Sequence, residues 1–298
     1  KLQILYRGNM FEQYGGWPTL LSELCDGENL TSEKTELVLS EILSGEVDPS
    51  QISAFLIALK VKGETTEEII GLVRAMLNAS EPLSLPENAI DIVGTGGSLQ
   101  RREAALNVST MASFVAAASG AVVCKHGNRR ASSTSGAFDL LDALGLPLDQ
   151  TPMQVAEQVK SKNLGFAFAK TFHPAMRFAG PVRAGIGVPT VFNILGPLSH
   201  PGRIKRHLIG TVNSELAKQM AEVLLENGSK HAWIVTGETG IDEISVTGTT
   251  NIVELKDGKI SEWILDPSDF GISLYSNDAI TVSYTHLRAH ETDSYLVC

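Results

Sequence analysis

The 298-residue sequence has little cysteine, few aromatic residues and a deficit of positive charge. Its cysteines, Cys25, Cys124 and Cys298, are far apart and form no CxxC motif. This spacing argues against a disulfide scaffold or a structural zinc site and favours a reducing, cytoplasmic environment. Lysine and arginine number 24 against 34 aspartates and glutamates, a net charge of −10. We therefore do not expect nucleic acid as a partner, because its phosphates require a positive field.

The sequence also lacks a long apolar run. The most apolar stretch, Met111–Cys124, is rich in alanine and is interrupted by two serines and a glycine. It is too short and too polar to span a bilayer. No apolar segment follows Lys1, so we expect neither a signal peptide nor a membrane partner.

The first eighty residues have the periodicity of short helices. Helices are expected near residues 17–26, over Ser32–Leu43, from Pro49 to about Gly63, and from Thr66 to Leu77. Asp48 followed by Pro49 is typical of a helix start, with aspartate as N-cap and proline at the first helical position. Glu67 and Glu68 suit the positive end of a helix dipole. These signals predict a helical domain over residues 10–80.

From residue 88 the pattern changes to short apolar strands separated by helices, which indicates an α/β fold with a mostly parallel sheet. Strands are expected over Ala89–Val93, Ala121–Lys125, Leu164–Ala169, Lys205–Thr211 and Ala232–Thr236, and helices over Asn107–Ser119, Ser135–Leu144, Met153–Lys162 and Ser214–Glu226. Pro189 and Pro197 predict a loop or a broken element from Gly187 to Leu195. We expect the α/β domain to span residues 88–281, with a helical segment near 150–190 packing against the first domain.

Two loops at predicted strand ends have the composition of anion sites, and open α/β sheets bind ligands beyond such ends. The glycines of Gly94–Gly97 let backbone N–H groups approach an anion, although a plain glycine-rich turn explains them equally well. The second loop, Lys125–Gly136, concentrates three cations and three serines. In a protein this acidic, that density favours an oxyanion site over a solvated basic loop.

Two residue pairs further along the chain are weaker candidates. His173 and Arg183 flank an apolar segment, and Asp242 and Glu243 follow the last predicted strand. Taken alone, a structural histidine, a surface arginine and surface acids are the simpler interpretations. Adjacent carboxylates at a strand end also suit Mg²⁺, a hard cation that prefers oxygen ligands.

Together these motifs resemble those of the anthranilate phosphoribosyltransferases, from about Leu20 to about Phe270. The motifs that carry the resemblance are Gly94-Thr95-Gly96-Gly97, Asn107-Val108-Ser109-Thr110, Lys125–Asn128 with Ser132-Ser133, His173-Pro174, Arg183, residues 193–198 and Asp242-Glu243. The resemblance implies a small helical domain joined to a larger α/β domain. It also implies transfer of the phosphoribosyl group of 5-phosphoribosyl 1-diphosphate to anthranilate, a step of tryptophan biosynthesis that releases pyrophosphate. Mg²⁺ as cofactor and a homodimer formed through the helical domain follow from it.

The resemblance also assigns roles to individual residues. It implies that the phosphoribosyl diphosphate is held by Gly94, Thr95, Gly96, Gly97, Ser98, Asn107, Ser109, Thr110, Lys125, Asn128, Ser132 and Ser133. It implies an anthranilate site made of Gly94, His126, Asn128, His173 and Arg183, and Mg²⁺ bound through Ser109, Asp242 and Glu243. Charge develops on the ribose and on the leaving pyrophosphate, so catalysis needs positioning and electrostatic stabilisation, and no dedicated base is assigned.

The sequence departs from the family pattern in the donor loop and at its ends. Ser98 stands where the family usually has aspartate. Arg101 and Arg102 follow in a longer loop, and either contact the diphosphate or begin a solvated helix. The resemblance fades after about Phe270, and residues 282–298 fit nothing in the family. We expect a truncated reading frame with a non-native tail, and Met10 as the native start.

Two other functions are open on the sequence alone. Pyrimidine nucleoside phosphorylases share the expected architecture, but His173 and Arg183 suit an aromatic carboxylate better, because a guanidinium binds two oxygens at once. A non-catalytic relative that binds nucleic acid is the second alternative. The net charge and the Asp242-Glu243 pair oppose it.

Overall fold

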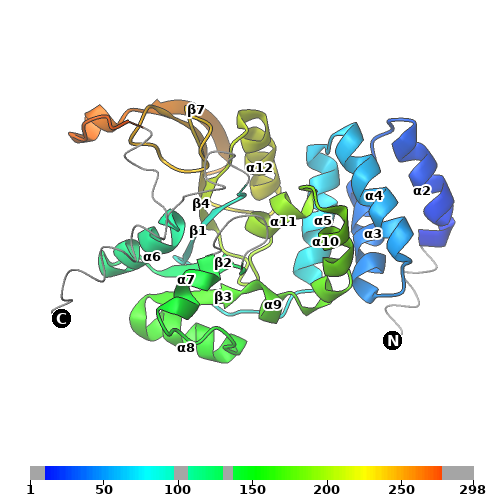
Figure 1. Ribbon diagram of the computed structural model, residues 1–298, viewed down its shortest axis with the longest axis horizontal. Helices are drawn as coiled ribbons and strands as arrows, with labels where there is room; N and C mark the ends of the chain where they lie inside the picture. The colour runs from blue at the N-terminus through cyan, green and yellow to red at the C-terminus, as the bar shows by residue number, and fades with distance from the viewer. Residues whose placement is uncertain (1–10, 97–106, 130–136, 277–298) are drawn as a thin grey trace.

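The helices of the first eighty residues begin at the capping side chains that the sequence offers. In the computed structural model, which describes residues 11–96, 107–129 and 137–276, these helices are α2 (Gly16–Cys25), α3 (Ser32–Ser44), α4 (Pro49–Lys62) and α5 (Thr66–Asn78). Thr31, Asp48 and Thr65 each accept a hydrogen bond from the first turn of the helix that follows. The prediction of a small helical domain is confirmed, and Figure 1 shows it at one end of the molecule.

Glu68 ties this domain together from the first turn of α5. Its fully buried carboxylate accepts hydrogen bonds from the backbone N–H of Leu30 at 2.9 Å and of Thr65 at 2.8 Å. The ammonium of Lys62, at the end of α4, donates to the same carboxylate at 2.9 Å. Because the Thr65 hydroxyl accepts from the Glu68 N–H in return, the two residues form a capping box.

We expect Glu68→Ala to lower the free energy of unfolding by about 3–5 kcal/mol, since it leaves two buried backbone N–H groups without an acceptor and removes the carboxylate partner of Lys62, whose ammonium keeps only the Asn29 side chain and the Gly63 carbonyl as acceptors. Glu28→Ala, at an exposed residue of the same domain, is the control and should change stability by less than about 0.5 kcal/mol. Urea unfolding followed by circular dichroism measures both. Equal stability of the two variants would show that Glu68 has no structural role.

The α/β domain is built on a sheet in which parallel strands are followed by an antiparallel hairpin. Among the described residues the sheet has seven strands in the order β3-β2-β1-β4-β5-β6-β7. Their bounds are β1 (Ile90–Gly94), β2 (Val123–Gly127), β3 (Leu164–Phe168), β4 (Arg206–Gly210), β5 (His231–Gly237), β6 (Thr250–Lys256) and β7 (Lys259–Leu265). β1 pairs in parallel with both β2 and β4, so the carboxyl ends of these strands meet in the middle of the sheet. The predicted fold class is confirmed.

Helices pack against the sheet along most of its width. They are α6 (Val108–Ala118), α7 (Ala137–Ala143), α8 (Pro152–Lys162) and α12 (Ser214–Glu226). α6 packs against β1 and β2, and α8 packs against β3. α12 packs against β5 and β6 and also contacts α5, so it joins the sheet to the helical domain (Figure 1).

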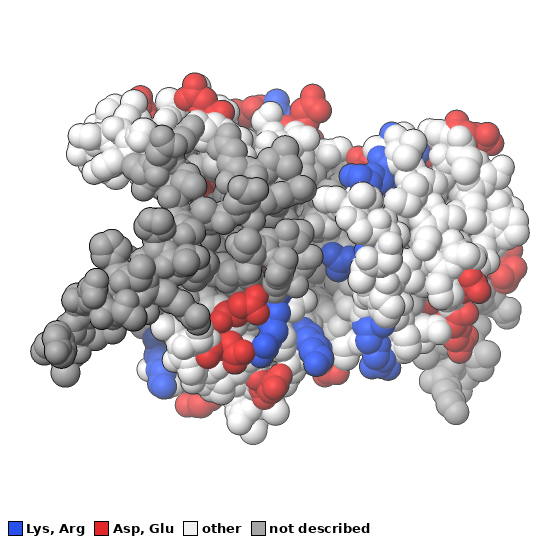
Figure 2. Space-filling view, viewed as in Figure 1, with Lys and Arg blue, Asp and Glu red and all other residues white. Residues whose placement is uncertain are grey.

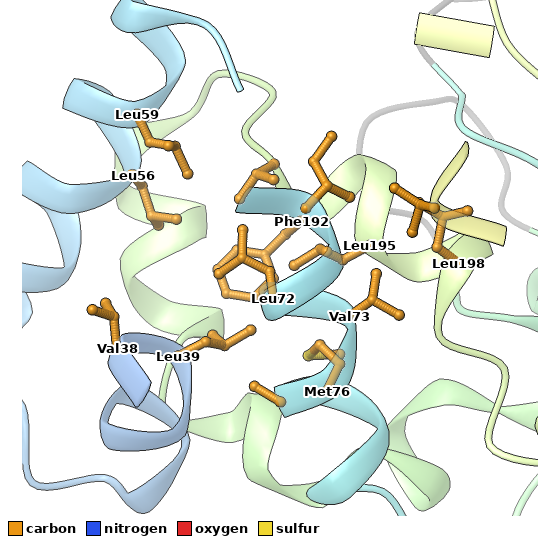
Figure 3. Close-up of a cluster of buried hydrophobic side chains, with 14 of the residues drawn as sticks. Val38, Leu39, Leu56, Leu59, Leu72, Val73, Met76, Phe192, Leu195 and Leu198 are labelled. Carbon is orange, nitrogen blue, oxygen red and sulfur yellow. The ribbon is translucent and has the colours of Figure 1, made fainter. Parts of the chain in front are cut away.

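The chain between β3 and β4 is more helical than its prolines predict. It contains α9 (Ala169–Phe172), the 3-10 helix η2 (Pro174–Arg177), α10 (Gly180–Ile186) and α11 (Phe192–Leu198). Of the two predictions for Gly187–Leu195, a loop or a broken element, the loop is wrong from residue 192 onward, where α11 begins and carries Pro197 inside it. Figure 3 shows the reason, because side chains of α11 lie against α5 in one buried cluster. Burial of three apolar side chains outweighs the single backbone hydrogen bond that Pro197 removes.

A second contact fixes the same segment to the helical domain. Gly45 ends α3 with a φ of +86°, and a Cβ there would lie 2.5 Å from the ring of Phe178. α10 packs against α4 close by. The region from η2 to α11 thus packs on the helical domain, whereas α8 packs on the sheet.

Candidate active site

Glycines at the ends of β1 and β4 leave room for a loop that follows β5 and carries Asp242 and Glu243, the acidic loop. This loop lies against the carboxyl ends of the two central strands. The Gly96 N–H donates to the Asp242 carboxylate at 3.1 Å, and the Thr95 N–H donates to the Gly210 carbonyl at 2.8 Å. A Cβ on Gly94 would lie 2.8 Å from the Asp242 carboxylate, and one on Gly210 would lie 1.7 Å from the Asp242 carbonyl oxygen. Only residues without a side chain allow this approach.

Lys125 joins the same site from β2. It was expected at the start of a loop, but β2 runs to Gly127 and buries Lys125 to 1% exposure. Its ammonium donates to Ser109 Oγ at 3.1 Å and to the Ile92 carbonyl. Burial lowers the pKa of Lys125, and the negative charges of Asp91 and Glu243 oppose that shift. The lysine, the serine at the start of α6 and the acidic loop therefore share one charged site.

Asp91 is a site residue that the sequence analysis did not single out. It is fully buried in β1, and its Oδ1 accepts a hydrogen bond from the His126 N–H at 3.0 Å. Burial raises the pKa of Asp91 to about 7, with Lys125 and backbone hydrogen bonds acting in the opposite direction. Its Oδ2 has no hydrogen-bond partner among the described residues. An aspartate between two isoleucines of a buried strand is the sequence signal that indicates it.

Three buried histidines from distant segments meet at the end of β2. The His126 ring centroid lies 5.1 Å from that of His173 and 5.5 Å from that of His200. His200, which the sequence did not indicate, is fixed by two hydrogen bonds. Its Nε2–H donates to the Cys124 carbonyl at 3.0 Å, and its Nδ1 accepts from the Gly202 N–H at 3.0 Å.

His126 and His173 have ring nitrogens to offer a ligand. The Nε2 of His126 and both ring nitrogens of His173 are buried without a hydrogen bond of good geometry among the described residues, although the backbone groups of Gly196 and Ser199 lie close enough to act on the two rings. Burial lowers the pKa of His173 to about 4 and that of His126 well below its usual range. Each ring is therefore neutral near pH 7 and presents one N–H donor and one acceptor.

The buried histidines also make the stability of the protein depend on pH. Burial lowers the pKa of His173 and of His207 to about 4 and that of His200 to about 3. Below about pH 6.5 the unfolded chain therefore binds protons that the folded chain does not, so stability falls as the pH falls. Asp91, with its raised pKa, binds its proton in the folded state first and acts in the opposite direction.

Because more histidines than aspartates are shifted, we expect the free energy of unfolding to fall between about pH 6.5 and about pH 4.5. Urea titrations at a series of pH values measure this slope. The His200→Asn variant, which has one buried imidazole fewer, should show a shallower slope. Stability that rises on acidification across this window would contradict the prediction.

The remaining predicted site residues have fewer contacts with the site, or lie outside the described residues. Arg183 lies half-buried in α10 with its guanidinium 4.9 Å from the Phe192 ring centroid, and burial lowers its pKa. Among the described residues no hydrogen bond links Arg183 to His126. The Asn128 side chain accepts from the Arg129 N–H at 2.8 Å. Gly97, Ser98, Arg101, Arg102, Ser132, Ser133 and residues 282–298 lie outside the described residues.

The acidic loop is suited to a cation that keeps several waters. In the described ranges, no group of three or more histidine, cysteine, aspartate or glutamate side chains has an arrangement that could hold a metal ion on its own. Asp242 is 4% exposed, and its carboxylate is oriented by the Gly96 N–H. Two adjacent carboxylates with a nearby serine hydroxyl fit Mg²⁺, which binds few protein ligands and takes phosphate oxygens, better than they fit a structural zinc ion.

Charged side chains of both signs lie on the surface of the molecule. In Figure 2 acidic and basic side chains are interspersed, with several basic ones near the junction of the two domains. Of the helices in the described ranges, none has the length and apolar composition that crossing a bilayer requires.

Two family models match the chain. The helical bundle domain of a glycosyl transferase family matches residues 18–80, and the a/b domain of that family matches residues 86–291. The anthranilate phosphoribosyltransferase of Rhodopseudomonas palustris (strain TIE-1) is 43% identical over 262 residues, 88% of this chain and 77% of that protein. The anthranilate phosphoribosyltransferase of Agrobacterium fabrum is 46% identical over 253 residues, 85% of this chain and 73% of that protein.

Solved structures give the same result. Anthranilate phosphoribosyltransferase from Thermus thermophilus matches with a TM-score of 0.81 and 39% identity, over 91% of this chain and 80% of that one. The Saccharomyces cerevisiae enzyme in complex with PRPP and Mg has a TM-score of 0.79 and 31% identity, over 90% and 77% of the two chains. The same yeast enzyme in complex with 4-fluoroanthranilate has a TM-score of 0.78 and 28% identity, over 93% and 80%.

Proposed function

The chain belongs to the anthranilate phosphoribosyltransferase family, and from that premise we propose that it transfers the phosphoribosyl group of 5-phosphoribosyl 1-diphosphate to anthranilate. The products are N-(5-phosphoribosyl)anthranilate and pyrophosphate, and the step belongs to tryptophan biosynthesis. The observation that carries the proposal is one charged site at the ends of β1, β2 and β4. There a buried lysine, a serine at a helix start, glycine amides and two carboxylates meet.

We assign the donor to the glycine loop and the start of α6. Pyrophosphate leaves from the anomeric carbon, so negative charge grows on the leaving group while positive charge grows on the ribose. Lys125, held by Ser109, is placed to stabilise the negative charge without reorganisation. The assigned donor residues are Gly94, Thr95, Gly96, Asn107, Ser109, Thr110, Lys125 and Asn128, with Gly97, Ser98, Ser132 and Ser133 outside the described residues.

We assign Mg²⁺ to Asp242, Glu243 and Ser109. The yeast relative binds Mg together with PRPP, and the Glu243 carboxylate here lies within electrostatic reach of Lys125. When bound, the ion would neutralise charge on the diphosphate. The Gly96 N–H holds Asp242 in place, so the glycine loop positions both the donor and the acidic loop.

We assign anthranilate to Gly94, His126, Asn128, His173 and Arg183. The yeast relative binds 4-fluoroanthranilate, a close analogue. The neutral rings of His126 and His173 offer unpaired nitrogens, and the guanidinium of Arg183 suits a carboxylate. The aromatic amine is uncharged near pH 7, so these residues need only orient it for attack on the anomeric carbon.

We also propose that the chain forms a homodimer through the helical domain and works in the cytoplasm. On α4, Ile57 and Val61 lie one turn apart and both are exposed, Val61 to 82%. Cys25 and Cys124 are free thiols, which suits a reducing compartment. The domain boundaries that we propose are 10–80 and 88–281. Sedimentation of the full chain measures the oligomeric state.

An anthranilate-consumption assay tests the proposed function directly. We expect the fluorescence of anthranilate to disappear only when 5-phosphoribosyl 1-diphosphate and Mg²⁺ are both present. The loss of fluorescence should stop when EDTA is added. Phosphorolysis of uridine without anthranilate consumption would favour the nucleoside phosphorylase alternative. Activity that survives EDTA would overturn the assignment of the acidic loop to Mg²⁺.

A further inference from the structure

A cavity outside the candidate active site lies where α5, α11 and α12 meet the start of β4. Its volume is about 60 Å³, and it shares only His200 with the site described above. Since one buried water requires at least about 10–15 Å³, the cavity has room for about four to six atoms of that size, the bulk of a phosphate ion. The ring of His200 is fully hydrogen-bonded, so it acts as a neutral wall between cavity and site.

The cavity is lined by two cations and by no acidic side chain. Lys205 uses one of its three N–H donors, on the Asn227 carbonyl at 2.7 Å. Arg203 makes only long contacts, at 3.4 Å, to the Leu77 carbonyl and the Asn78 side chain. In the part of the chain that the structure describes, neither cation has an ion-pair partner. Burial and the positive charges of Arg203 and Lys230 lower the pKa of Lys205, and no acidic neighbour raises it. The charge around Lys205 is therefore positive.

Two further polar groups of the lining are unsatisfied. His207 is 6% exposed and donates its Nε2–H to the Ile204 carbonyl at 3.0 Å, which leaves Nδ1 as a buried acceptor. That Nδ1, and the Nδ2 donor of Asn227, have no hydrogen-bond partner among the described residues. Both of these atoms are buried, so the cavity offers mainly the charged donors of Lys205 and Arg203 and, 3.2 Å from His207 Nε2, the Ser229 hydroxyl.

We propose that this cavity binds inorganic phosphate as a second oxyanion site of the protein. The oxygens of hydrogen phosphate match the charged donors of Lys205 and Arg203, which have no acidic partner in the described part of the chain. The site is independent of the proposed transferase activity, because it shares no assigned donor, acceptor or metal ligand with it.

Calorimetric titration of the full chain with inorganic phosphate, at constant ionic strength, tests this site. The donor site also attracts phosphate, so the titration is repeated in the Lys125→Met background, where we expect one phosphate site to remain. In that background Lys205→Gln and Arg203→Gln should each weaken phosphate binding about tenfold or more, because each removes a charge-assisted hydrogen bond. Lys230→Gln, an exposed cation outside the lining, is the matched control and should change affinity less than about twofold.

Two outcomes would overturn the proposal. Phosphate affinity that is the same in the wild type, Arg203→Gln and Lys205→Gln would place binding elsewhere. Loss of all binding in Lys125→Met alone would assign phosphate to the donor site. Should Lys205→Gln fail to fold, Lys205→Arg must retain binding and Arg203→Gln must lose it. Anthranilate consumption by Lys205→Gln is expected to be unchanged, which separates this test from that of the proposed function.

Discussion

Gly210→Ala is expected to lower kcat/KM for phosphoribosyl transfer by about 10²-fold or more, because misplacing a site by about 1 Å has effects of this size. The added Cβ would lie 1.7 Å from the Asp242 carbonyl oxygen and 2.6 Å from its carbon. These are backbone atoms, so no side-chain rotation relieves the clash. The acidic loop must move away from the ends of β1 and β4, and its carboxylates move with it.

The matched controls for this prediction are two other glycine-to-alanine changes. A Cβ on Gly94 would meet the Asp242 carboxylate oxygen at 2.8 Å, an atom that can rotate aside, so Gly94→Ala should be milder. Gly180 has open space around it and an ordinary φ, so Gly180→Ala should be close to wild type. Anthranilate consumption as a function of Mg²⁺ concentration ranks the three, and circular dichroism reports folding. If Gly210→Ala kept the Mg²⁺ dependence of the wild type, Asp242 would have no role in the Mg²⁺-dependent reaction.

Lys125→Met is expected to lower kcat/KM for the donor by about 10²–10³-fold, the range seen when one preorganised donor to a developing negative charge is removed. Methionine fills a similar volume, so the buried strand keeps its packing. Asp91 then loses its cationic neighbour, so its pKa, already about 7, moves higher. The Asp91 carboxyl therefore takes up a proton and leaves no unpaired buried charge.

Steady-state kinetics with each substrate varied in turn separates this role from a structural one. The effect should fall on the donor and leave the KM for anthranilate nearly unchanged. Asp91→Asn provides the complementary measurement, because loss of the aspartate charge lowers the pKa of Lys125 and shifts the alkaline limb of the pH profile to lower pH. An unchanged donor kcat/KM in Lys125→Met would remove the lysine from the mechanism.

Much of the fold was predictable from local signals. The caps at Thr31, Asp48 and Thr65 define helix starts because each interaction spans only two or three residues. The hairpin of β6 and β7 was missed although its signal is present, since Asp257-Gly258 joins two alternating stretches. Both turn residues adopt positive φ, 49° and 80°, as a tight hairpin requires.

The arrangement of the candidate site depends on contacts that no local pattern specifies. Gly96 and Asp242 are 146 positions apart, and they meet only because β4 pairs with β1. The sequence places β4 after β3, but β3 lies on the far side of β2. His200 joins His126 through the same strand order. The types of the site residues could therefore be read from motifs, whereas their partners could not.

The packing of α11 on α5 has a consequence for synthesis on the ribosome. The core of the helical domain includes Phe192, Leu195 and Leu198, which emerge roughly 120 residues after α5. At a translation rate of about 5–20 residues per second, the nascent helices wait roughly 6–24 s before these side chains arrive to cover them. During that interval the apolar face of α5 is open to chaperones, so chain order rather than helix formation sets the time at which this core is completed.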